Sequence, residues 1–222
     1  MNAESGRRIV AEAVGTAMLL AAIVGSGIMA ARLSGGNDAI ALLANSVATG
    51  AALVALILTF GPISGAHFNP AVTIADASQR GLDWREVPGY VGAQVGGAVL
   101  GVWAAHAMFG ERIFMLSLHE RSGASQAFSE FVATFGLVAV IWGCSRRRVE
   151  AVPFAVAAYI TAAYWFTAST SFANPAVTIA RGLTDTFAGI RPLDVPGFIV
   201  AQLAGAAVAT VLFRWLAPAS RS

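Results

Sequence analysis

Two asparagines in identical surroundings are the side chains of this sequence best suited to recognising a small molecule. Asn69 begins the letters NPAVTIA in the first half of the chain, and Asn174 begins the same seven letters 105 residues later. An asparagine amide carries donors and an acceptor but no charge, so it can hydrogen bond a solute without exchanging a proton. The repeated motif therefore favours binding of a neutral, hydrogen-bonding molecule over catalysis.

Four further polar residues recur at matched positions. Glu12 lies in AEAVGTAML and Glu130 in SEFVATFGL, whereas Gln94 lies in VPGYVGAQVGGAV and Gln202 in VPGFIVAQLAGAA. A carboxylate within a membrane segment invites a functional hypothesis such as a proton relay. Because the repeat preserves all four residues, we favour a different role, in which they brace the segments before the asparagines through hydrogen bonds.

The composition predicts a membrane protein. Of the 222 residues, 57% are hydrophobic and 12% are charged, with a mean hydropathy of +0.69; soluble domains carry about 25% charge. The net charge of +2 implies no nucleic-acid surface, and the single Cys144 excludes an internal disulfide and a cysteine-based metal site. No nucleotide loop or catalytic pair is visible, so the sequence supports neither an enzyme nor a pump, and it implies no cofactor.

Six segments are apolar enough to cross a bilayer, which takes about 20 residues. They cover roughly 9–31, 39–60, 86–109, 126–145, 151–168 and 194–217. The first segment contains Glu12 and is too long for the apolar part of a secretory signal, so we interpret it as a retained span. Two linkers, 61–80 and 169–185, are too short to cross and too apolar for a solvated loop, and each contains an Asn-Pro pair.

The repeated motifs predict two halves of opposite orientation. Residues 1–110 form the first repeat, 111–125 a linker and 126–222 the second repeat. Three spans per copy is an odd number, so the copies must insert as an inverted repeat. Placing both termini inside puts nine arginines inside and five outside, a modest bias that supports this orientation; Arg146–Arg148 belong to it as a topology signal.

Each repeated motif predicts a short helix that spans only part of the bilayer. Asparagine is a good N-cap and proline suits the first helical turn, so half-helices are expected near 69–79 and 174–182. Inverted symmetry brings their N-termini together near the midplane, where two positive dipole ends repel cations and interrupt a proton wire. The approach segments must be buried or line a watery cavity. The result is a narrow pore for a neutral solute, which we call the lane.

Paired NPA boxes on six spans resemble the aquaporin, or major intrinsic protein, family over nearly the whole chain. The resemblance implies NPA boxes completed by Pro70, Ala71, Pro175 and Ala176, and a homotetramer in the lipid bilayer with one pore per subunit. It also implies a multi-pass protein of the bacterial inner (plasma) membrane with cytoplasmic termini.

Relatives in this family select solutes at a filter outside the NPA boxes, and this chain departs from the usual pattern there. A gap-free count from the two asparagines places the four filter positions at Thr49, Ala162, Ser171 and Val177. Water-selective relatives usually carry an aromatic residue, a histidine and, at the fourth position, an arginine. With Val177 in place of arginine we expect a wider filter that lacks a guanidinium.

Arginine-free filters resemble those of bacterial members encoded with arsenic-resistance genes. We therefore expect a passive channel for arsenite, which is neutral As(OH)3 at neutral pH, and for related metalloid hydroxides and methylated arsenicals. Two alternatives stay open: a general water, glycerol or polyol channel, and a non-conducting structural membrane protein. Val177 is followed by Thr178, where glycerol facilitators usually have aspartate, so a dedicated glycerol role is not favoured.

The remaining polar residues are expected to have mainly structural roles. His67 precedes Asn69 by two residues and is expected to fix the loop or line the pore, with no second metal ligand nearby. His106 is interpreted as a packed or interfacial residue. Asp76 and Arg181 each follow their asparagine by seven residues, and we expect them to cap or anchor the half-helices. Arg181 could instead be a displaced filter arginine, but two helical turns place it too far along the helix to reach the filter easily.

Overall fold

The computed structural model describes residues 3–217, and in this part of the chain the regular secondary structure is entirely helical. The α-helices are α1 (Ala3–Leu33), α2 (Asp38–Ser64), α3 (Pro70–Ser78), α4 (Val87–Phe109), α5 (Ala124–Ser145), α6 (Val152–Phe166), α7 (Pro175–Arg181) and α8 (Val195–Leu216). Two 3-10 turns, Val149–Ala151 and Pro192–Asp194, lead into α6 and α8. The predicted all-α membrane fold with six spans is confirmed, because six segments of the described chain are long and apolar enough to cross a bilayer: α1, α2, α4, α5, and α6 and α8 each taken with the 3-10 turn before it.

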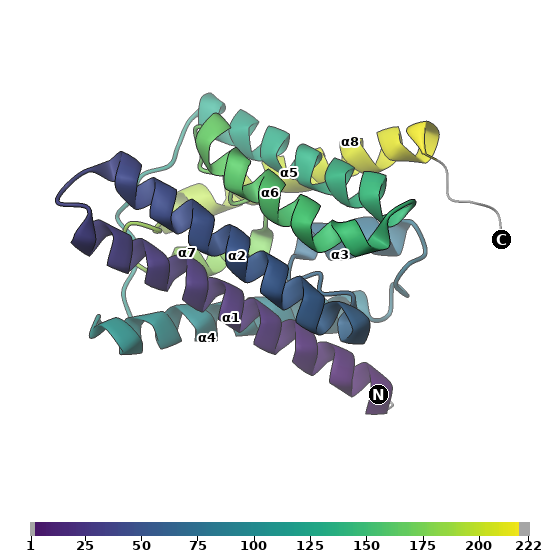
Figure 1. Ribbon diagram of the computed structural model, residues 1–222, viewed down its shortest axis with the longest axis horizontal. Coiled ribbons are helices and arrows are strands. Elements are labelled where there is room, and N and C mark those ends of the chain that lie inside the picture. The colour runs from purple at the N-terminus through teal and green to yellow at the C-terminus, as the bar shows by residue number, and fades with distance from the viewer. Residues whose placement is uncertain (1–2, 218–222) are drawn as a thin grey trace.

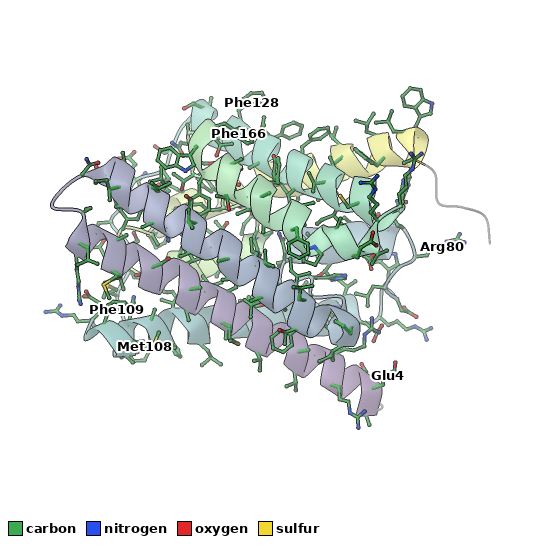
Figure 2. The ribbon with its side chains drawn as sticks, in the orientation of Figure 1. Glu4, Arg80, Met108, Phe109, Phe128 and Phe166 are labelled. Atoms are coloured by element: carbon green, nitrogen blue, oxygen red, sulfur yellow. The ribbon has the colours of Figure 1, made fainter. Side chains whose placement is uncertain are left out.

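The outer surface of the long helices is apolar, as a lipid-facing surface must be. Large hydrophobic side chains such as Leu43, Leu58, Leu100 and Val200 are more than half exposed. Figure 2 shows charged side chains such as Glu4 and Arg80 toward one end of the long helices, and Met108 and Phe109 toward the other. The start of α1 and the end of α8 lie at the same end of the molecule (Figure 1).

The two halves use the same close helix contact. α1 packs against α4 in the first half, and α5 packs against α8 in the second. A methyl group added at Gly97 would collide with the carbonyl of Ala13, and one added at Gly205 would collide with that of Phe131. These glycines stand three residues after Gln94 and Gln202, so the absence of a side chain allows the same backbone approach in both copies.

The two short helices are capped by the asparagines. Asn69 and Asn174 adopt extended backbone angles, and their side-chain oxygens accept hydrogen bonds from the backbone N–H groups of Ala71 (2.9 Å) and Ala176 (3.0 Å). Proline occupies the first helical position each time. In Figure 1, α3 lies toward the end where the chain begins and α7 toward the opposite end, and the two helices are in contact. The opposed half-helices of the fold are therefore present.

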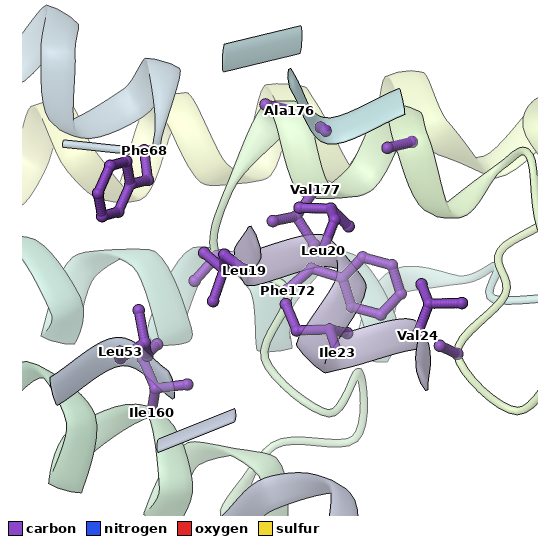
Figure 3. Close-up of a cluster of buried hydrophobic side chains, with 14 of the residues drawn as sticks. Leu19, Leu20, Ile23, Val24, Leu53, Phe68, Ile160, Phe172, Ala176 and Val177 are labelled. Atoms are coloured by element: carbon purple, nitrogen blue, oxygen red, sulfur yellow. The ribbon is translucent and has the colours of Figure 1, made fainter. Parts of the chain in front are cut away.

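The core lies between the long helices and the loops that precede α3 and α7. Figure 3 shows Leu19 and Ile23 of α1, Leu53 of α2 and Ile160 of α6 gathered with Val177 of α7. These side chains form an apolar wall, and the site described next opens along it.

Candidate functional site

Glu12 holds the loop before α3. Its carboxylate is fully buried and accepts hydrogen bonds from the backbone N–H groups of His67 (2.9 Å) and Phe68 (2.7 Å) and from the Ser64 hydroxyl (2.7 Å). The amide of Gln94 donates at 2.8 Å to Oε2, the carboxylate oxygen that also accepts from Phe68. A buried carboxylate that accepts several hydrogen bonds is well compensated, and here it fixes a loop that has no helix of its own.

Glu130 holds the loop before α7 in the same way. It accepts from the backbone N–H groups of Phe172 (2.9 Å) and Ala173 (2.8 Å), and from the amide of Gln202 at 2.6 Å. The two glutamines also donate to matched threonines, Gln94 to Thr73 (2.9 Å) and Gln202 to Thr178 (2.8 Å). Through these hydrogen bonds the glutamates and glutamines hold the two loops in place, as the bracing role requires.

Both loops contain left-handed backbone at the same places. The residues three and one before each asparagine have positive φ: Ala66 (48°) and Phe68 (49°) in the first loop, and Ser171 (50°) and Ala173 (46°) in the second. Such angles are disfavoured for residues with a side chain and cost about 1–3 kcal/mol each. The bonds to Glu12 and Glu130 compensate for this strain.

The asparagines join the two halves to each other. The amide nitrogen of Asn69 donates to the carbonyl of Ala173, and that of Asn174 donates to the carbonyl of Phe68, each at 2.7 Å. One N–H of each amide is therefore committed to the opposite loop. The second N–H of each amide remains available to a solute, and both residues line the cavity described next.

A cavity of about 610 Å³ runs along the contact between the half-helices. It is lined mostly by apolar side chains of α1, α2, α5 and α6, including Leu19, Ile23, Leu53, Ile57, Leu137, Ile141, Val156 and Ile160. Its polar lining comes from the two approach loops and half-helices, including His67, Asn69, Asp76, Ser171, Asn174 and Arg181. At one end it reaches Ser145 and Glu150; toward the other, the lining on α2 begins at Thr49 and that on α6 ends at Tyr164.

The gap-free count placed one filter position wrongly. Thr49, Ser171 and Val177 line the cavity, but Ala162 does not, and its side chain is exposed on the outside of α6. Residues four apart share one face of a helix, and the cavity face of α6 carries Val156, Ile160 and Tyr164.

Near the end of α6 it is Tyr164, not Ala162, that lines the cavity. Its hydroxyl lies 3.2 Å from that of Thr49 and forms a hydrogen bond between α6 and α2. The four-residue spacing of Val156, Ile160 and Tyr164 could have identified this tyrosine from the sequence. The count runs across the loop between α6 and Asn174, so it does not follow the faces of α6.

Arg181 lies at the end of α7 and lines the cavity. Its side chain is 2% exposed, and its guanidinium carbon lies 3.4 Å from the centre of the Phe172 ring. Its Nε also donates to the carbonyl of Ala188, so it ties the end of α7 to the loop that follows.

At the other half-helix, Asp76 lines the cavity beside His67. The Nε2 of His67 lies 3.6 Å from the Asp76 carboxylate, and its Nδ1 lies 3.1 Å from the Thr73 hydroxyl. His67 thus both contacts the half-helix and lines the lane. His106 is packed away from the cavity, with its Nε2 2.8 Å from the Thr184 hydroxyl. Within residues 3–217 no cluster of three or more His, Cys, Asp or Glu side chains could hold a metal ion.

Six spans around a lane, with two half-helices meeting inside it, define a multi-pass membrane channel. A family model described as Major intrinsic protein matches residues 1–151, and the chain belongs to this family of channels for small solutes.

Relatives match over most of the chain. Aquaglyceroporin AqpS of Rhizobium meliloti (strain 1021) is 56% identical over 215 residues, which cover 97% of this chain and 92% of that protein. Aquaporin NIP1-1 of Oryza sativa subsp. japonica is 35% identical over 90% of this chain and 70% of its own length. The X-ray structure of the aquaglyceroporin from Plasmodium falciparum has the same fold, with a TM-score of 0.75 at 22% identity, covering 96% of this chain and 98% of that one.

Proposed function

We propose that this chain is a passive channel for arsenite and related neutral metalloid hydroxides in the bacterial plasma membrane. The observation that carries the proposal is the lining at the end of the cavity. Thr49 and Tyr164, whose hydroxyls lie 3.2 Å apart, line the cavity together with Ser171 and the apolar side chain of Val177. Arsenite presents three hydroxyl groups and no charge, so side-chain hydroxyls can form hydrogen bonds with it as donors or acceptors. The apolar lining beside them keeps its binding weak enough for the solute to pass on.

The similarity to a protein named aquaglyceroporin supports this assignment. Aquaglyceroporins are named for glycerol, and As(OH)3 is close to glycerol in size and hydroxyl pattern. Most of the side chains that line the lane are apolar, which suits passage of an uncharged solute. Passive efflux of intracellular arsenite down its gradient is the physiological role we propose, with methylated arsenicals as further solutes, in a homotetramer whose termini face the cytoplasm.

Arsenic flux into proteoliposomes tests the proposal. Purified protein should accelerate arsenite entry several-fold over empty vesicles, with a temperature dependence typical of a channel. Thr49→Phe and Val177→Arg narrow the same part of the lane and should reduce arsenite entry more than water entry. Arsenite entry equal to that of empty vesicles would reject the proposal.

A general polyol channel is favoured by the same hydroxyl groups, and one measurement separates the alternatives. Stopped-flow swelling with glycerol, water and arsenite ranks the solutes for the same vesicles. Glycerol entry without arsenite entry would assign a polyol channel. Acceleration of none of the three would assign the non-conducting structural protein, in which the Thr49–Tyr164 bond closes the lane.

A further inference from the structure

Arg181 and Val177 lie on the same face of α7, one helical turn apart. Residues four apart are neighbours on a helix surface. The Cα–Cβ bonds of a helix tilt toward its N-terminus, so the long side chain of Arg181 extends back over the preceding turn, toward the level of Val177. Both residues line the cavity. A guanidinium is thus present beside the filter although residue 177 is apolar.

The guanidinium of Arg181 is only partly satisfied. Its Nε donates to Ala188 and its face stacks on Phe172, but Nη1 is buried without a hydrogen-bond partner among residues 3–217. No carboxylate of the described residues lies within ion-pair distance of it. A buried donor without a partner costs free energy, more so when it is charged, and needs an explanation.

A second unpaired group lines the same cavity. Ser171 is 3% exposed, and its hydroxyl oxygen has no hydrogen-bond partner in the described part of the chain. Arg121 adds to the positive potential here, because its guanidinium carbon lies 5.1 Å from the centre of the same Phe172 ring. Unpaired donors and a positive field at one place are complementary to an oxygen atom of a neutral or weakly acidic solute.

We propose that Arg181 supplies the fixed positive charge and the hydrogen-bond donors of the filter in place of residue 177, and that Arg181 and Ser171 together bind an oxygen atom of a hydroxyl-bearing solute in transit. The charge excludes sodium and hydronium ions by repulsion in a poorly solvated lane. The filter then still contains a cation although position 177 is valine, because Arg181 supplies it from one helical turn further along α7. The inference depends on the proposed function only in requiring that the lane conducts.

Three variants in proteoliposomes test the assignment by water, sodium and proton fluxes. Arg181→Gln removes the charge but keeps an amide that can still donate to Ala188. Arg181→Lys keeps the charge without the planar fork. The double variant Val177→Arg with Arg181→Gln returns a guanidinium to the family position. Arg32→Gln is the matched control, because Arg32 pairs with Glu111 at the end of α1 and does not line the cavity.

Arg181→Gln should raise sodium or proton leak about tenfold or more while water still passes. Arg181→Lys and the double variant should both keep the leak at the wild-type level, as should Arg32→Gln. Arg181→Gln should also slow glycerol relative to water. A wild-type leak in Arg181→Gln with water permeation retained would overturn the proposal.

If Arg181→Gln abolishes water permeation altogether, the double variant distinguishes a filter role of Arg181 from a purely anchoring role. Recovery of water permeation with low leak supports a movable filter cation, whereas a closed or unfolded double variant shows that Arg181 acts only as an anchor for α7 and overturns the inference. None of these readouts uses arsenic, so a failure here is distinct from absence of arsenite flux in the wild-type channel.

Discussion

At the residue scale, we expect the selectivity of this channel to depend on which side chains occupy the cavity face of α6. Tyr164 lies on that face and bonds to Thr49, whereas Ala162 faces outward. The bond between the two hydroxyls joins two neighbouring helices that line the lane. Solute size should therefore be controlled by the phenol ring and not by the alanine.

Tyr164→Ala should widen the lane and raise the entry of polyols larger than glycerol several-fold, because it removes the ring and the bond to Thr49. Ala162→Leu adds bulk to the outer face of the same helix and should leave every solute flux unchanged. Swelling rates of proteoliposomes with a series of polyols would measure this. The prediction that Tyr164 forms the filter is wrong if Ala162→Leu lowers the entry of the larger polyols and Tyr164→Ala leaves it unchanged.

The paired asparagines allow a substitution that isolates the bond between the halves. Asn69→Asp keeps a good N-cap but places an oxygen against the carbonyl of Ala173, and Asn174→Asp does the same against Phe68. Each should destabilise the protein by about 1–3 kcal/mol, measured as a lower melting temperature in detergent. Asn37→Asp is the control, since Asn37 caps α2 at the surface and donates to no second loop in the described structure. Equal effects at all three positions would contradict a special bond at the midplane.

At the element scale, each half-helix depends on a buried glutamate carried by a long helix. α1 and α5 present Glu12 and Glu130 to loops whose backbone would otherwise be strained and unpaired. The glycine contacts at Gly97 and Gly205 bring α4 and α8 close enough for the glutamines to reach the same carboxylates. The spans thus position the loops, and the loops form the lane.

Glu12→Gln and Glu130→Gln should each destabilise the protein by about 3 kcal/mol and lower permeation of every solute alike, because an amide cannot accept all the hydrogen bonds of the carboxylate. Melting temperature and water flux in the same preparation would measure both effects. Glu4→Gln lies on α1 with an exposed side chain and should change neither. A variant at Glu12 that keeps its stability but alters proton leak would point back to the proton relay.

At the scale of the whole molecule, an inverted repeat places both ends of the described chain on one side. α1 begins and α8 ends at the same end of the bundle (Figure 1), near the turn at Glu150 that leads into α6. The loop between α4 and α5 lies at the other end, next to Met108 and Phe109 (Figure 2). From the arginine bias we propose that the first of these ends faces the cytoplasm.

Cysteine labelling in cells would test that orientation. In a Cys144→Ser background, Glu4→Cys and Glu150→Cys should resist an impermeant maleimide until the membrane is opened, whereas Arg112→Cys should react at once. All three positions are exposed in the structure. The reverse pattern would place the termini outside and invert the proposed path of efflux.

The sequence predicted the spans, the half-helices and the contacts of the repeated polar residues because hydropathy, capping and repetition are local signals. It failed at Ala162, where a count across a loop requires a loop length that no local signal gives. No local signal in the sequence places Arg181 in the cavity lining, because the number of turns from Asn174 does not show how far a long side chain reaches. The bonds between Asn69 and Ala173 require both halves together and have no signature in either one.

The hydrogen bonds between the loops have a consequence for biosynthesis. Asn69 finds its acceptor 104 residues further along the chain, so the first half leaves the ribosome with its amide donor unmatched. An unmatched donor cannot rest in hydrocarbon, and the first loop must therefore stay hydrated or be shielded by the insertion machinery until residue 173 arrives. A ribosome stalled before that residue should leave the first three spans in place with a loop that proteases can still cut.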